Sequence, residues 1–279
     1  MVEPPFLYTR WFKPIMGERW YRMKIWTVKG IRFFALTLLF LGGTHSLLWS
    51  FSFSPISQTF SPEGRGSTRT FRLKNESEDY IAIRIKILTR SVTPEGKEKN
   101  RPADDLFTVY PAQVVVQPQS NQTVRIKWNG PSDIRQEQCF RVLVEQVPVQ
   151  FENSSNSESN LKIMFRYLGA LYITPEGAQP DVILETHSVE PAPSDASGRN
   201  RLNFTIYNQG NRHAILNNLS LRINTAGATS EPVHVIDSDK LEGISGENIL
   251  PDSRRHFSVP LPSEIQGDTL QVEIEYDTQ

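Results

Sequence analysis

The sequence predicts an all-β protein built from two immunoglobulin-like β-sandwiches. Residues 51–279 show almost no helical periodicity, and short stretches of alternating apolar and polar residues recur along them. This alternation is expected of strands that bury one face. Clusters of Gly, Pro, Asn and Ser separate the stretches and predict turns. The first seven stretches fall within about 125 residues, a spacing typical of one sandwich.

The first sandwich is predicted to span residues 51–174. Its clearest strand is residues 80–90, where Ile81, Ile83, Ile85 and Ile87 share one face, which we expect to be buried. The stretch 107–118 contains a proline, which cannot donate a ladder hydrogen bond, so it should form an edge strand or two short pieces. The other predicted strands are residues 51–60, 68–75, 122–128, 139–148 and 161–173.

A second sandwich is predicted over residues 181–279, after a linker at residues 175–180. The linker lies in the stretch "TPEGAQP", whose two prolines and glycine break the strand pattern. Two sandwiches joined by so short a linker predict a bent, boomerang-like molecule. The strands expected in the second sandwich are residues 181–191, 201–210, 212–223, 231–236, 254–262 and 269–277.

The first 50 residues have the composition of a signal or targeting segment. Basic residues are frequent over 10–32, the apolar run "FFALTLLFL" follows at 33–41, and small residues come next. This run is shorter than the roughly 20 residues that span a membrane, so we expect a cleaved secretory signal. Residues 1–22 precede a methionine better placed to start such a signal, and we interpret them as an upstream extension. If the apolar stretch continues to Trp49, an uncleaved anchor remains the alternative.

Charge and cysteine content exclude several classes of protein. The formal net charge of −1 provides no general attraction for nucleic acid. A single cysteine, Cys139, allows no intrachain disulfide, and we expect it to be a small core residue. An exported chain without a disulfide suits the bacterial periplasm. The five histidines lack ligand-like spacing, and phosphate-binding loops are missing. We therefore expect no metal, cofactor, small-molecule substrate or catalytic residue, and no enzymatic activity.

Five segments follow one another in an order that a known family shares. They are "VYPAQVVVQPQSNQTVRIKW" (109–128), "CFRVLVEQVPVQ" (139–150), "LKIMFRYLGALYITPEG" (161–177), "FTIYNQGNRHAILNNLSL" (204–221) and "ILPDSRRHFSVP" (249–260). In this order and spacing the chain resembles a divergent member of the PapD-like periplasmic pilus, or fimbrial, assembly chaperones. The resemblance covers about residues 51–277.

The resemblance implies a chaperone that stabilises subunits whose immunoglobulin-like fold lacks one strand. The chaperone donates its seventh strand, here about residues 161–172, a mode of strand addition for which chaperone–pilin pairs are an established example. The implied partners are pilin-like or surface-fibre subunits and an outer-membrane usher. The polar segment 152–160 matches the connection before the donated strand. The subunit-binding row is Leu161, Ile163, Phe165 and, by periodicity, Tyr167.

One part of the family pattern is different here. The best-known members hold the subunit's C-terminal carboxylate with an Arg in the first strand and a Lys in the seventh. The corresponding positions fall near Ser57 and Ala170, and neither is basic. Arg166 has the strand parity of Ala170 but lies four residues away, or roughly 13 Å along a strand. It is a weak candidate for a basic anchor, and a solvated strand residue is the simpler interpretation.

Two other classes of protein remain open from the sequence. One is a two-domain immunoglobulin-like surface or structural protein without chaperone activity, anchored by the N-terminal apolar segment. The other is an exported enzyme or enzyme inhibitor on the same scaffold, for which no group of residues provides support. A soluble segment directly before an apolar strand favours the chaperone over both.

Export gives the first testable prediction. Because the apolar run is short and small residues follow it, the mature protein should begin near residues 47–51. Mass spectrometry of the protein isolated from its native host measures this directly. A mature chain that still carries residues 33–41 would instead support the anchored surface protein.

Overall fold

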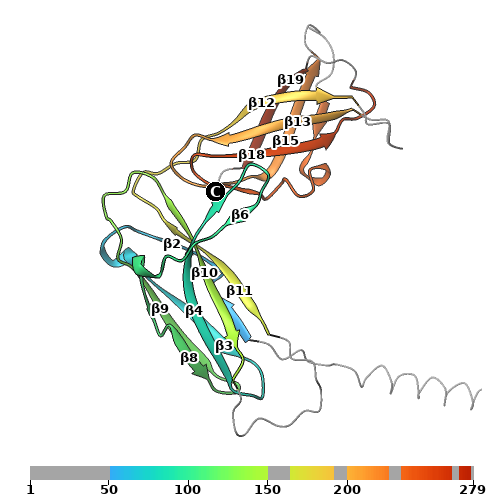
Figure 1. Cartoon of the computed structure of the whole chain (residues 1–279). Coiled ribbons are helices and arrows are strands. Elements are labelled where there is room, and N and C mark those ends of the chain that lie inside the picture. The colour runs from blue at the N-terminus through green and yellow to red at the C-terminus, as the bar shows by residue number, and fades with distance from the viewer. Residues whose placement is uncertain (1–50, 150–163, 192–199, 226–233, 266–269, 278–279) are drawn as a thin grey trace, which may run out of the picture. The chain divides into compact units, whose positions relative to one another are not determined.

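The computed structural model describes residues 51–149, 164–191, 200–225, 234–265 and 270–277 (Figure 1). The predicted signal segment lies outside these ranges. The regular elements described are strands and three short 3-10 turns: η1 (Gly64–Ser67), η2 (Asp104–Leu106) and η3 (Ser238–Lys240). Buried apolar side chains form two separate clusters, one drawn from residues 51–173 and the other from residues 182–272. The prediction of an all-β chain with two sandwiches is confirmed.

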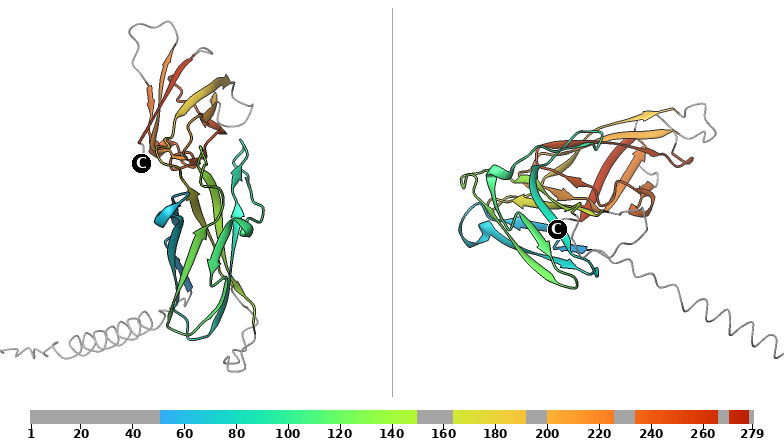
Figure 2. Two further views of the ribbon diagram at one scale, coloured as in Figure 1. Left: turned by 90° about the vertical axis from the view of Figure 1, so that its left-hand side faces the viewer. Right: turned by 60° about the horizontal axis from the view of Figure 1, so that its bottom comes forward.

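The first sandwich consists of two sheets whose layers can be followed in Figure 2. The four-stranded sheet has the order β1 (Phe51–Ser54), β3 (Thr68–Asn75), β9 (Asn121–Trp128) and β7 (Phe107–Tyr110). The five-stranded sheet has the order β2 (Ser57–Phe60), β11 (Arg166–Ile173), β10 (Gln138–Val147), β4 (Ile81–Thr89) and β8 (Gln113–Val116).

Prolines divide two of the predicted strands. The stretch 51–60 is not one strand, because β1 pairs with β3 in one sheet while β2 pairs with β11 in the other. Pro55, which follows a cis peptide bond, lies at the change of sheet and has no N–H with which to continue a ladder. The stretch 107–118 forms two short pieces, β7 and β8, each at the edge of its sheet, as predicted.

The core of the first sandwich lies between these sheets. The isoleucine row of β4 faces inward, with Ile81 the most exposed of its members at 6%. A cluster of rings fills one part of the core, where Phe107 meets Trp128 and Phe140 edge-on at centroid distances of 5.1 and 5.0 Å. The predicted core face of this strand is confirmed. Cys139 was predicted to be a core residue, but it has the opposite parity to buried Phe140 and is only half-buried.

The second sandwich has a three-stranded sheet on each side of its core. One contains β12 (Val182–Glu190), β13 (Arg201–Asn208) and β18 (Ser253–Pro260). The other contains β16 (His234–Ile236), β15 (Asn217–Thr225) and β19 (Leu270–Asp277). The described residues also contain two pairs of two-residue strands, of which only one strand lies within a predicted stretch, 212–223, because so short a strand has no readable period. They are β5 (Ser91–Val92) with β6 (Glu98–Lys99), and β14 (Ala214–Ile215) with β17 (Asn248–Ile249).

A fully buried asparagine ends a strand in each sandwich. The side-chain amide of Asn75, the last residue of β3, donates to the carbonyl oxygens of Asp79, Val116 and Gln117 at 2.8, 3.2 and 2.9 Å. Its side-chain oxygen accepts the backbone N–H of Ser77 at 3.0 Å. Asn208, the last residue of β13, makes corresponding bonds: its side-chain amide donates to the carbonyl oxygens of Arg212 and Ile249, and its side-chain oxygen accepts the N–H of Gly210. Each asparagine thereby satisfies buried backbone groups that no ladder reaches.

Replacing Asn75 should destabilise the first sandwich. Asn75→Ala leaves several buried backbone groups unpaired, so we expect it to lower the free energy of unfolding by about 2–4 kcal/mol. Denaturant unfolding of the mature protein measures the change. Asn129→Ala is the control, because the side chain of exposed Asn129 donates to the hydroxyl of Thr108 and not to a buried backbone group. Equal stability losses in the two variants would contradict the role assigned to Asn75.

Candidate functional site

Strand β11 is paired along its whole length on one side but only in part on the other. It pairs antiparallel with β10 from Arg166, opposite Glu145, to Ile173, opposite Gln138. On its other side it pairs with β2 only from Ala170 to Ile173. Within the described ranges no strand pairs with Arg166–Gly169 on that side. Backbone donors and acceptors at an unpaired edge can accept a strand from another chain.

The structure describes two of the four predicted subunit-binding residues. Leu161 and Ile163 lie outside the described residues, as does the polar segment 152–160. Phe165 and Tyr167 are half-buried against the core of the first sandwich. Both rings meet Phe51 of β1 edge-on, at centroid distances of 6.5 and 5.0 Å. These two side chains therefore point toward the sandwich to which they belong.

The opposite face is open to solvent over residues 164–168, whereas Ala170 and Tyr172 further along it are buried. Met164 and Leu168 are 55% and 40% exposed, although both are apolar. The side chain of Arg166 is 68% exposed, and its guanidinium lies 3.4 Å from the Glu145 carboxylate. Glu145 also accepts a shorter bond from Arg84, at 2.8 Å. This arrangement is that of a solvated strand residue with an ion pair, the simpler of the two interpretations of Arg166.

The two positions expected to carry a basic anchor are neighbours in the structure. Ala170 pairs with Ser57 on one side and with Arg141 of β10 on the other. Arg141 thus places a guanidinium group on the strand next to Ala170, although Ala170 itself is not basic. No local sequence pattern marks Arg141, because the register between β10 and β11 decides which residue lies beside Ala170.

Arg141 belongs to a half-buried cluster in which two cations share one carboxylate. Its Nε donates to Glu98 Oε1 at 2.8 Å, and Arg90 Nε donates to Glu98 Oε2 at 3.2 Å. Arg90 also donates to the hydroxyl of Tyr172 at 3.0 Å. Burial alone would raise the pKa of Glu98, but bonds from Arg141 and the charges of both arginines hold that pKa below its ordinary value. Glu98 therefore stays ionised, and the three groups together carry one net positive charge.

A second buried carboxylate lies close to the start of β10. Glu137 accepts the backbone N–H of His213 at 3.0 Å and the hydroxyl of Thr174 at 2.7 Å. The ring Nδ1 of His213 lies 2.6 Å from the same carboxylate. Cys139 Sγ is 3.8 Å from Glu137, and burial first, then this negative charge, raise the pKa of the thiol. The thiol is therefore not a thiolate nucleophile at neutral pH.

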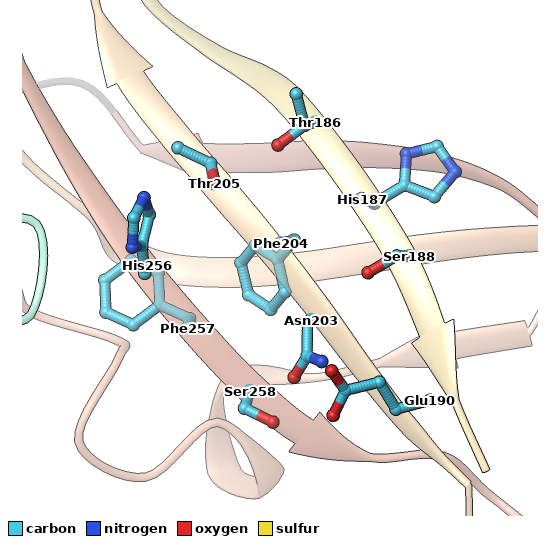
Figure 3. Close-up of a pocket in the computed structure, with 10 residues that line it drawn as sticks. All are labelled: Thr186, His187, Ser188, Glu190, Asn203, Phe204, Thr205, His256, Phe257 and Ser258. Carbon is cyan, nitrogen blue, oxygen red and sulfur yellow. The ribbon is translucent and has the colours of Figure 1, made fainter.

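A shallow pocket with a volume of about 510 Å³ lies on the sheet β12–β13–β18. His187 Nε2 lies 2.9 Å from the carbonyl oxygen of Leu270, and His256 Nδ1 lies 4.0 Å from Glu95. The partner of each imidazole is therefore a carbonyl oxygen or a carboxylate, and not a hydroxyl group that the imidazole could activate as a nucleophile. Figure 3 shows the hydroxyl, amide and imidazole side chains that line it, among them Thr186, Thr205, His256, Ser188, Asn203 and Ser258.

The described residues contain no group of three or more His, Cys, Asp or Glu side chains placed to hold a metal ion. They also contain no helix long and apolar enough to cross a membrane.

Comparison with known proteins relates the chain to solved chaperones. No curated protein matched it. Among solved structures, the chaperone CsuC, in the CsuC–CsuE chaperone–tip adhesion subunit complex from the archaic Csu pili of Acinetobacter baumannii, matches with a TM-score of 0.51 and 14% identity. That match covers 80% of this chain and 97% of the other. The class 5 fimbriae chaperone CfaA matches with a TM-score of 0.50 and 14% identity, over 82% of this chain and 100% of the other. At these identities the likeness concerns the fold.

A family model identifies the first sandwich more directly. Residues 61–179 match the model of the pili and flagellar-assembly chaperones, PapD N-terminal domain. This range contains β3 to β11, and with them the open edge and the Arg141 cluster. The family is one of chaperones and not of enzymes. Through residues 61–179, the first sandwich is therefore similar to the PapD N-terminal domain of the pilus assembly chaperones, and the solved chaperones share the fold of the chain.

Proposed function

We propose that the chain is a periplasmic chaperone that stabilises pilus or surface-fibre subunits by strand donation. The donated segment is residues 161–172, which would complete an immunoglobulin-like fold that lacks one strand. The observation that carries the proposal is the unpaired edge of β11 at Arg166–Gly169. A subunit strand added there would gain main-chain hydrogen bonds without needing a particular sequence.

The four residues of the predicted row supply the apolar part of this contact. Phe165 and Tyr167 already pack against the core of the first sandwich, so we propose that they support the base of the donated strand. Leu161 and Ile163 precede them and would enter the subunit's groove. Each buried side chain of this kind contributes about 1.5–3 kcal/mol, which must offset about 4–15 kcal/mol for association and ordering. Ladder bonds and apolar burial are therefore both needed.

The remaining parts of the proposal follow from the family and the fold. The chain acts in the periplasm after export, has no enzymatic activity, and hands its subunits to an outer-membrane usher. Its first domain comprises residues 51–174 and its second residues 181–279, joined by a linker at 175–180. The CsuC–CsuE structure, a chaperone with a tip adhesion subunit, supports a partner of the subunit class for this chain.

We also propose that Arg141 takes the role of the missing basic anchor. It lies beside Ala170, which pairs with Ser57 on its other side, and these are the two positions at which other family members are expected to carry Lys and Arg. The cluster of Arg141, Arg90 and Glu98 keeps one uncompensated positive charge, which a subunit's C-terminal carboxylate could neutralise. Arg166, which is more exposed and paired with Glu145, is the less suitable group.

A charge placed in the donated row should abolish subunit capture. Ile163→Asp would push an uncompensated carboxylate into an apolar groove, at a cost of several kcal/mol. We expect the variant to keep the wild-type melting temperature but to lose its partner in affinity purification from periplasm. The partner is identified by mass spectrometry of the wild-type complex.

Lys162→Asp is the matched control, since it adds the same carboxylate one position away, on the other face of the strand. It should retain the partner. Phe165→Asp is a less clean test because Phe165 packs against Phe51, so its loss should also lower the melting temperature. If the Ile163→Asp protein is stable and still holds the subunit, strand donation by this row is wrong.

Removing the proposed anchor should weaken capture without abolishing it. A charge-assisted bond contributes about 1.5–3 kcal/mol, so Arg141→Ala should reduce affinity for the subunit by about 10- to 100-fold. Titration of the purified subunit onto immobilised chaperone measures this change. Arg166→Ala should bind like wild type. Equal affinities for the two variants would remove Arg141 from the site and leave the strand-donation proposal untouched.

A further inference from the structure

We infer that Phe51 is a positioning residue for the donated strand, holding its C-terminal half in place before a subunit arrives. This inference rests on the proposed function. Phe51 begins β1 and is 3% exposed. It acts through Phe165 and Tyr167, and its sequence context does not distinguish it from the other apolar residues of 51–60.

The contacts of Phe51 with the donated strand are of two kinds. Its ring meets Phe165 at 84° and Tyr167 at 75°, both edge-on arrangements that aromatic pairs favour. Its carbonyl oxygen accepts the hydroxyl of Tyr167 at 2.6 Å. Side chain and backbone of one residue therefore fix two successive inward-facing side chains of the donated segment.

These contacts lie where the segment is paired with a described strand on one side only. β1 is an edge strand of the four-stranded sheet, while β11 lies in the five-stranded sheet. From Arg166 to Gly169, β11 has β10 on one side and, among the described residues, no strand on the other. The three rings of Phe51, Phe165 and Tyr167 bridge the two sheets beside this open edge.

An edge of β11 that is already ordered should bind a subunit more tightly than one that becomes ordered only on binding. A segment that is ordered only on binding loses conformational freedom at that moment, and the loss weakens the complex. By holding Phe165 and Tyr167, Phe51 lets the free chaperone present the edge already in strand geometry. In this proposal Phe51 itself does not enter the subunit's groove, which Leu161 and Ile163 would fill.

Hydrogen exchange of the free mature protein tests the inference without any partner. Phe51→Ala should raise by about tenfold the exchange rate of those backbone amides of residues 165–169 that bond to β10, because local opening becomes easier. Phe53→Ala is the matched control: Phe53 lies in the same strand, is 5% exposed, and stacks on Phe71 instead. It should destabilise the sandwich without a selective effect on residues 165–169. Equal exchange of this segment in the two variants overturns the inference.

Two further variants cover the case in which Phe51→Ala does not fold. Phe51→Leu keeps an apolar side chain but removes the ring contacts, and Tyr167→Phe keeps the rings but removes the hydroxyl bond. Each should raise exchange at residues 165–169 selectively, and wild-type exchange in both overturns the inference. Subunit affinity, measured with the same variants, should fall about tenfold more for Phe51→Ala than for Phe53→Ala. A wild-type protein that captures no subunit would refute the proposed function, whereas the exchange result would stand by itself.

Discussion

The unequal pairing of β11 is the constraint on which the site depends. One side of the strand is bonded to β10 over eight residue pairs, whereas the other is bonded to β2 over four. The full ladder fixes the direction and register of the strand, and the incomplete one leaves backbone groups available to another chain. A strand paired fully on both sides could not be extended, and a strand paired on neither would have no fixed register.

Pro55 is central to this incomplete pairing. Because it ends β1 and lets β2 begin in the other sheet, the first stretch of the described chain covers only the end of β11. β1 stays close enough for Phe51 to contact Phe165 and Tyr167, but it hydrogen-bonds to β3. The open part of the edge is thus supported by side chains while its backbone groups stay free of a described strand.

The outward face of the same sheet carries two clusters of arginine and glutamate, which differ in burial. Next to the open edge, Arg84 and Arg166 share Glu145, and further along Arg90 and Arg141 share Glu98. Exposed pairs of the first kind contribute little to stability. The second cluster is more buried, so its remaining positive charge is less screened and is the stronger attraction for a carboxylate. Position relative to solvent, and not the number of arginines, distinguishes the two clusters.

The sequence by itself determined the all-β class, the two sandwiches and the inward row of Ile81, Ile83, Ile85 and Ile87, because these depend on a local period of two. It also pointed to Phe165 and Tyr167 through the same period. Only the tertiary structure decided that Phe51 lies against them and that Ala170 has Arg141 and Ser57 as neighbours. It also decided that the pairing of β2 with β11 begins at Ala170 and leaves Gly169 out. These contacts and registers join residues up to 116 positions apart in the sequence. A local pattern carries no information on which distant strand will pair with a given strand, or on where that pairing ends.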